Sequence, residues 1–141
     1  MRVADYMTSD PVSVTEDTTM KEAAELLRQH HVRHLPVVQG RMLIGIVSDR
    51  DIRKASPSLL SGVDMSEYED VLSNTPISRV MTREPFTVTP DTDLRDAVQI
   101  ILDKRVGAVP VVNGKELVGM FADFQGLGVL VKLLSQVPQQ S

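Results

Sequence analysis

Two stretches of the chain can be superimposed without a gap: PVVQGRMLIGIVSDRD, at positions 36–51, and PVVNGKELVGMFADFQ, at positions 110–125. Their starting positions, 36 and 110, differ by 74, and the same shift aligns Met7 with Met81. The alignment continues from Met7 to about Arg53. A match of this length indicates an internal duplication, so we treat the chain as two copies of one unit.

Each copy has the residue pattern of a β-α-β-β-α unit. In the first copy, residues 11–14, 35–38 and 43–47 are predicted strands, one helix begins near Thr19, and a second begins after Ser48. The first helix of each copy is predicted from apolar residues at helical spacing: Met20, Ala23, Ala24 and Leu27, then Leu94, Ala97, Val98 and Ile101.

Local signals mark the ends of these elements. Thr19 and Glu22 predict a capping box at the start of the first helix, and Asp93 and Asp96 hold the equivalent positions in the second copy. The Asn before Gly114 is a strong hairpin signal between the last two strands of a copy.

The predicted fold is α+β, with the two motifs packed around a pseudo-two-fold axis into one disc-like module, because one copy alone cannot easily bury its apolar face. We expect motif 1 at residues 1–54, a linker at 55–76, motif 2 at 77–134 and a disordered tail at 135–141. The linker is predicted to hold a short helix at residues 66–72, and another is predicted at 129–134.

Composition excludes several classes of function. The chain of 141 residues has no cysteine and a net charge of −4, which excludes disulfides and thiolate metal sites and argues against general nucleic-acid binding. No secretory signal and no apolar run long enough to span a membrane are visible. We therefore expect a cytoplasmic protein with no membrane or nucleic-acid partner.

Four stretches resemble a tandem of CBS motifs, often called a Bateman module, of the stand-alone type. They are MTSDPVSVTEDTTMKEA (7–23), HHVRHLPVVQGRMLIGIVSDRDI (30–52), MTREPFTVTPDTDLRDA (81–97) and KRVGAVPVVNGKELVGMFADF (104–124). The resemblance covers nearly the whole chain outside the linker and the tail.

The resemblance implies a regulatory module that binds an adenosine compound between its motifs without catalysis. The ligands that it suggests are AMP, ADP, ATP and S-adenosylmethionine, with no required cofactor. The implied site consists of Ser48, Asp51, Pro85, Phe86, Thr87, Val106, Gly107, Ala108 and Pro110, with Arg33 and His34 reaching phosphate groups.

Ser48 and Asp51 allow two interpretations on their own chemistry. A carboxylate accepts hydrogen bonds only, so Asp51 suits the vicinal diol of a ribose. Ser-x-x-Asp is equally a helix N-cap arrangement, in which the hydroxyl accepts from a free backbone N–H group. Arg33 is likewise either a phosphate contact or part of a surface ion pair.

The second copy has Ala122 and Gln125 where the first has Ser48 and Asp51. This difference suggests one good adenosine site and one degraded site. Arg33 and His34 are replaced by the small residues Gly107 and Ala108 in the second copy, which we expect to leave room for a base.

Other functions have less support. His30, His31 and His34 suggest a metal only weakly, since no carboxylate stands beside them at ligand spacing, and no metal site is predicted. We interpret Phe86 and Phe121 as core residues rather than stacking platforms. No enzyme motif is present.

The alternative function is a structural module that binds protein and no small molecule. In either case, we expect a homodimer formed through apolar helix faces, and an unidentified regulated protein as a partner.

Overall fold

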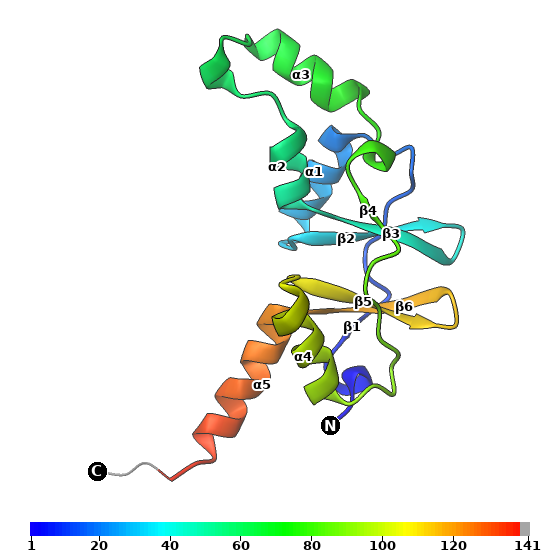
Figure 1. Cartoon of the computed structure of the whole chain (residues 1–141), viewed down its shortest axis with the longest axis vertical. Coiled ribbons are helices and arrows are strands. Elements are labelled where there is room, and N and C mark those ends of the chain that lie inside the picture. The colour runs from blue at the N-terminus through cyan, green and yellow to red at the C-terminus, as the bar shows by residue number, and fades with distance from the viewer. Residues whose placement is uncertain (139–141) are drawn as a thin grey trace.

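The computed structural model describes residues 1–138 and has the predicted α+β class (Figure 1). The elements of the first copy are η1 (Val3–Asp5), β1 (Thr8–Ser9), α1 (Met20–Gln29), β2 (His34–Gln39), β3 (Met42–Ser48) and α2 (Asp49–Ala55). The linker contains η2 (Leu59–Ser61) and α3 (Met65–Asn74). The second copy repeats the order with η3 (Ile77–Arg79), β4 (Thr82–Arg83), α4 (Leu94–Lys104), β5 (Ala108–Asn113), β6 (Glu116–Ala122) and α5 (Asp123–Ser135).

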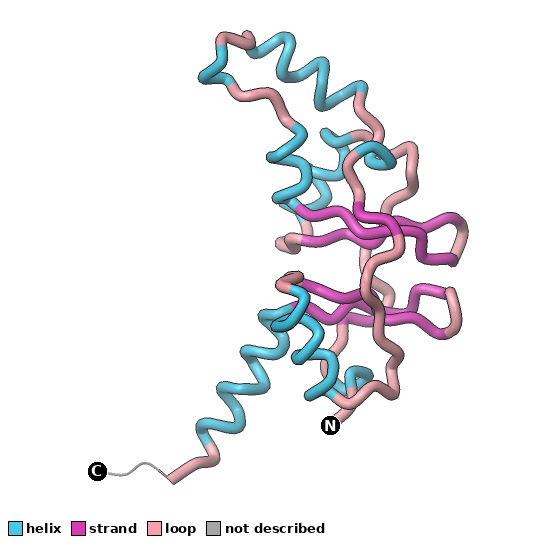
Figure 2. Tube along the Cα trace, in the orientation of Figure 1, coloured by secondary structure: helices cyan, strands magenta, loops and turns pink. Residues whose placement is uncertain are grey.

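Two antiparallel hairpins, β2–β3 and β5–β6, form the centre of the molecule (Figure 2). Gly40 and Gly114 turn the chain at φ values of 62° and 66°, a conformation that glycine adopts without a steric penalty. The predicted hairpins are therefore confirmed. A bridge between Met42 of β3 and Glu116 of β6 joins them into one six-stranded sheet.

The first strand of each copy pairs with the hairpin of the other copy. β1 pairs with β6, and β4 pairs with β3. The prediction of a strand at residues 11–14 is wrong, because only Val14 makes an isolated bridge there, to Val37. Asp10 has a φ of 47°, which turns the chain out of the strand, and Pro11 has no backbone N–H to donate.

Two apolar cores lie on either side of the hairpins. The first packs α1 and α2 against β2 and β3 and includes Leu72 and Ile77, which come from later in the chain. The second packs α4 and α5 against β5 and β6 and includes Val3 from the N-terminus. Each core is thus completed by residues from outside its own copy in the sequence. These residues tie the two copies into one module.

Two helix predictions and the predicted tail need correction. The linker helix is longer than expected, at Met65–Asn74. α5 is one continuous helix through Gly126, so the separate helix predicted at 129–134 is wrong. Gly126 packs closely there, since a Cβ at this position would lie 3.4 Å from Val98. Because α5 continues to Ser135, the predicted tail begins within it, and residues 139–141 of that tail lie outside the described residues.

The starts of α1 and α4 also differ from each other. Thr19 and Glu22 form the predicted capping box, with Glu22 N donating to Thr19 Oγ1 at 3.1 Å. Asp93 instead accepts from Arg95 N at 3.0 Å, so Asp96 takes no part in the cap. Within residues 1–138, no helix combines the length and apolar character needed to cross a membrane.

Candidate functional site

Two cavities lie where the copies meet, and the shift of 74 residues relates their linings. The cavity that includes Ser48 and Asp51, here called the Asp51 cavity, has a volume of about 630 Å³. Its counterpart includes Ala122 and Gln125, has a volume of about 620 Å³, and is called the Gln125 cavity. Both volumes are in the range of small-molecule sites.

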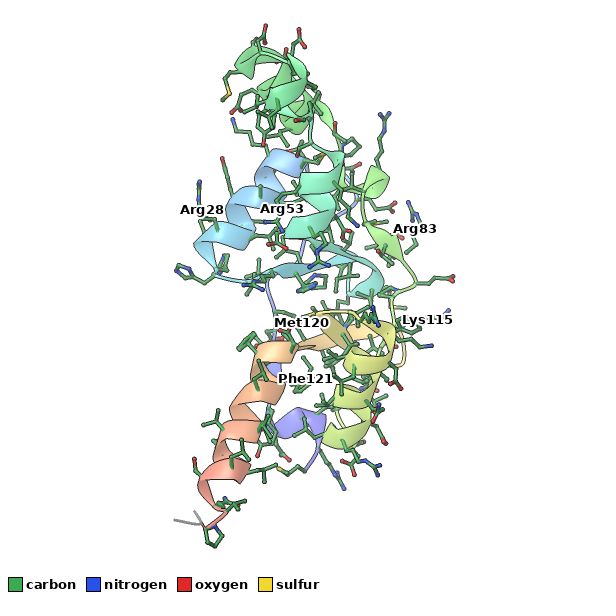
Figure 3. The ribbon with its side chains drawn as sticks, turned by 60° about the vertical axis from the view of Figure 1, so that its left-hand side comes forward. Arg28, Arg53, Arg83, Lys115, Met120 and Phe121 are labelled. Carbon is green, nitrogen blue, oxygen red and sulfur yellow. The ribbon has the colours of Figure 1, made fainter. Side chains whose placement is uncertain are left out.

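Strand alternation on β6 separates the cavity side from the core. Met120 lies toward the seam between the copies and lines the Gln125 cavity, while Phe121 lies on the core side (Figure 3). Phe121 is fully buried in the second core, as predicted. Phe86, by contrast, is 50% exposed and lines the Asp51 cavity, so its interpretation as a core residue is wrong.

The fold brings most of the predicted site residues together around the Asp51 cavity. These are Ser48, Asp51, Pro85, Phe86, Val106, Gly107, Ala108, Arg33 and His34. Thr87 and Pro110 do not line it. Pro110 is fully buried within β5, and Thr87 is exposed outside the cavity lining.

Several lining residues were missed from the sequence: Ile46, Asp49, Arg50, Arg53, Thr82, Glu84, Arg105 and Asp123. Arg50 and Arg53 follow Ser48 on α2 and could have been found from helical spacing. Thr82 and Glu84 line the cavity because β4 pairs with β3, a pairing between copies that no local pattern indicates.

Ser48 and Asp51 form a complete capping box at the start of α2. Asp51 N donates to Ser48 Oγ at 3.1 Å, and Ser48 N donates to Asp51 Oδ2 at 2.8 Å. The capping interpretation is therefore confirmed. The capping box uses one carboxylate oxygen of Asp51. Within the described chain, the other oxygen, Oδ1, has no hydrogen-bond partner, so capping and ligand binding are compatible.

Guanidinium groups border the Asp51 cavity from both copies. Arg53 pairs with Asp49 at 3.8 Å. Arg33, Arg50 and Arg105 make no ion pair with any described residue, so the surface ion pair considered for Arg33 is not observed. These exposed cations are available to an anionic ligand.

His34 occupies the space that small residues of the second copy leave open. A Cβ at Gly107 would lie 2.6 Å from His34 Cε1, so the ring takes the place of a side chain at position 107. The expected room for a base at Gly107 is thus partly filled by His34. Burial lowers the pKa of His34 below its usual 6.5, and the carboxylates of Asp123, Asp49 and Asp51 oppose this shift.

The Gln125 cavity differs in its hydrogen bonding. Gln125 Nε2 donates to Tyr6 O at 2.7 Å and to Thr8 Oγ1 at 3.2 Å. Its Oε1 accepts from Ala122 N at 2.8 Å. The amide at this position is thus engaged by the N-terminal segment, whereas the carboxylate of Asp51 keeps a free oxygen.

His30 and His31 line the Gln125 cavity together with His34. Among residues 1–138, however, no three histidine or carboxylate side chains gather closely enough to hold a metal ion. Phe124 and Leu127 give this cavity an apolar edge in place of Arg50 and Arg53.

The paired copies, the exchanged first strands and the two related cavities can be compared with known proteins. The family model described as "CBS domain" matches residues 3–58 and 77–124. The chain belongs to the CBS-domain family. The matched segments are the two copies, so the tandem arrangement of CBS motifs is confirmed.

Relatives with CBS domains cover most of the chain. The CBS domain-containing protein YhcV of Bacillus subtilis is 35% identical over 120 residues, which are 85% of this chain and 79% of YhcV. A CBS domain-containing protein of Dictyostelium discoideum is 30% identical over 141 residues, covering 99% of this chain and 97% of the relative. Among solved structures, CBSX2 of Arabidopsis thaliana in complex with AMP has a TM-score of 0.77 and 26% identity, covering 94% of this chain and 98% of CBSX2.

Proposed function

We propose that this CBS pair is a non-catalytic regulatory module that binds an adenosyl compound in the Asp51 cavity. The observation that carries the proposal is the free oxygen of Asp51, held by a capping box at the wall of a cavity of about 630 Å³. A carboxylate that already accepts from Ser48 N is fixed in orientation, and its other oxygen is available to a ribose hydroxyl group.

The remaining lining suits the base. Phe86, Val106 and Ala108 provide an apolar wall across the cavity from α2. Lys104 lies over the Phe86 ring at 5.2 Å from the ring centre, and this cation–π contact helps to hold the exposed ring in place. The AMP bound by CBSX2, a structural neighbour, is consistent with a ligand of this class.

The guanidinium groups without ion-pair partners favour a phosphorylated ligand. Arg33, Arg50 and Arg105 border the cavity without ion-pair partners in the described chain, and guanidinium groups match phosphate oxygens in geometry and charge. S-Adenosylmethionine has no phosphate group to pair with these guanidinium groups. We therefore rank AMP, ADP and ATP above S-adenosylmethionine.

A homodimer through α4 and α5 accompanies this function. α5 exposes Leu127, Leu130, Leu133 and Leu134, and an apolar groove of about 550 Å³ runs between α4 and α5. In the first copy, α3 packs on α1, supported by an ion pair of Lys21 with Glu69 at 3.8 Å. The uncovered α4–α5 surface is therefore the face on which a second copy would pack. Light scattering should give the mass of a dimer, and Leu130→Glu should give that of a monomer.

Thermal unfolding with ligands tests the proposal. AMP, ADP, ATP and S-adenosylmethionine are added to the wild type, to Asp51→Asn and to Asp64→Asn. Asp64 caps α3 outside both cavities, so its variant controls for the loss of a cap carboxylate. A ligand at 100 times its Kd adds about 2.7 kcal/mol to stability. We expect a nucleotide to stabilise the wild type and Asp64→Asn but not Asp51→Asn. No stabilisation by any of the four compounds would favour the alternative of a protein-binding module.

A further inference from the structure

The two cavities share a wall. Arg33, His34, Ala108 and Asp123 line both of them. His34 and Ala108 are equivalent positions under the shift of 74 residues, so the shared wall contains one imidazole rather than a symmetric pair. A single ring at the seam therefore faces both ligand sites.

Gly107 of the second copy leaves room for the ring of His34. The ring of His34 lies against the backbone of Gly107, where an added Cβ would be 2.6 Å from Cε1 and 3.0 Å from Nε2. A larger residue at position 107 would collide with the ring. The small Gly107 and Ala108 of the second copy thus accommodate the bulk of the first copy across the axis.

Charged groups from three directions face this ring. Asp49 and Asp51 come from α2, Asp123 comes from the start of α5, and Arg33 immediately precedes His34 in the chain. Asp49 N donates to Arg33 O at 3.0 Å, and Asp123 N donates to Gly107 O at 2.9 Å. These backbone hydrogen bonds hold the starts of α2 and α5 beside the ring, one on each cavity.

We propose that His34 couples the two cavities, because an anionic ligand in either one is sensed by the same imidazole. An added negative charge on either side favours the imidazolium form, and burial keeps the ring largely neutral until such a charge arrives. The first anion therefore binds with proton uptake. The resulting imidazolium then attracts a second anion to the other cavity, so anions in the two sites favour one another at a pH between the pKa values of His34 without and with bound anions.

The absence of cysteine from the chain permits a test with fixed charges. Phe86→Cys places a thiol in the Asp51 cavity only, and Phe124→Cys places one in the Gln125 cavity only. Each is alkylated with iodoacetate, which leaves an anion, or with iodoacetamide, which leaves a neutral group of nearly the same size. Ser66→Cys, exposed on α3, is the matched control.

The readout is the pKa of His34, followed by NMR of its ring and assigned with His34→Asn. We expect the anionic label to raise this pKa by roughly 0.5–1 unit relative to the neutral label at both cavity positions, and by much less at position 66. A rise from only one cavity, or from neither, would overturn the proposal.

The proposal rests on ligand binding in the Asp51 cavity, and a second measurement separates the two ideas. AMP is titrated calorimetrically into Phe124→Cys carrying each label, with and without His34→Asn. The anionic label should strengthen AMP binding by up to about threefold relative to the neutral label, and the difference should vanish with His34→Asn. If AMP binds without this difference, the coupling is wrong. If AMP binds nowhere, the proposed function fails, while the pKa measurement still decides whether His34 senses both cavities.

Discussion

Asp51 and Gln125 occupy equivalent positions in the two copies, yet their side chains form hydrogen bonds with different parts of the protein. Gln125 donates to Tyr6 O at 2.7 Å and so ties the N-terminal segment to α5. The side-chain hydrogen bond of Asp51 stays within the start of α2, at 2.8 Å from Ser48 N. The second copy thus uses this position to attach the N-terminal segment, and the first copy leaves a carboxylate oxygen facing a cavity.

Replacing Asp51 should separate capping from binding. Asp51→Asn keeps an acceptor for Ser48 N, so its free energy of unfolding should stay within about 0.5 kcal/mol of the wild type, while nucleotide affinity falls at least tenfold. Asp51→Ala should lose affinity and also about 1 kcal/mol of stability, since the cap is removed. Urea unfolding and calorimetric titration would measure both quantities. Full nucleotide affinity in Asp51→Asn would contradict the assigned role.

Gln125→Ala should weaken the attachment of the N-terminal segment. It leaves Tyr6 O and Ala122 N without their side-chain partners, which should cost about 1–3 kcal/mol. Hydrogen exchange at the amides of β1 and β6 should accelerate more than exchange in the β2–β3 hairpin. Equal acceleration in both hairpins would show that Gln125 supports the whole module rather than this attachment.

Gly119→Ala should disturb the crossing of β1 over β6. A Cβ at position 119 would lie 2.9 Å from Thr8 O and 2.7 Å from Met7 Sδ, so the strand must move, at a cost of about 1–3 kcal/mol. Gly128→Ala is the matched control, because nothing lies within 4 Å of its added Cβ and it stands within α5. That control should be stabilising by about 0.5–1 kcal/mol, since alanine favours a helix. Denaturant midpoints would compare the two variants, and similar changes in both would be inconsistent with the close approach.

His34 should make stability depend on pH in a defined direction. Its pKa is lowered in the folded state, so the unfolded chain binds more protons as the pH falls below 6.5. This contribution to stability is intact above 6.5 and is lost as the pH falls through the lower, folded-state pKa. Thermal unfolding between pH 8 and pH 5 should show a smaller decline for His34→Gln than for the wild type. Parallel declines would mean that the ring is no harder to protonate in the folded protein.

The local features of the fold could be predicted from residue patterns. The duplication is visible as a repeat at a shift of 74 residues. The hairpin turns at Gly40 and Gly114 and the apolar stripes of α1 and α4 depend on neighbours a few residues apart, so the amino-acid sequence specifies them directly. The capping box of Ser48 and Asp51 belongs to the same class. The strand predicted at residues 11–14 lies instead at residues 8–9. This shift could not be predicted, because the pairing there depends on β6, more than a hundred residues away.

The sequence by itself determined two similar β-α-β-β-α units and a polar pair at the start of one helix. Only the tertiary structure decided which residues of one copy face the other. The crossing of β1 and β4 brings Thr82 and Glu84 to the Asp51 cavity, and the packing of His34 on Gly107 places one imidazole between two sites. Such contacts join residues that are distant in the chain, and they form because neither copy can bury its apolar face alone.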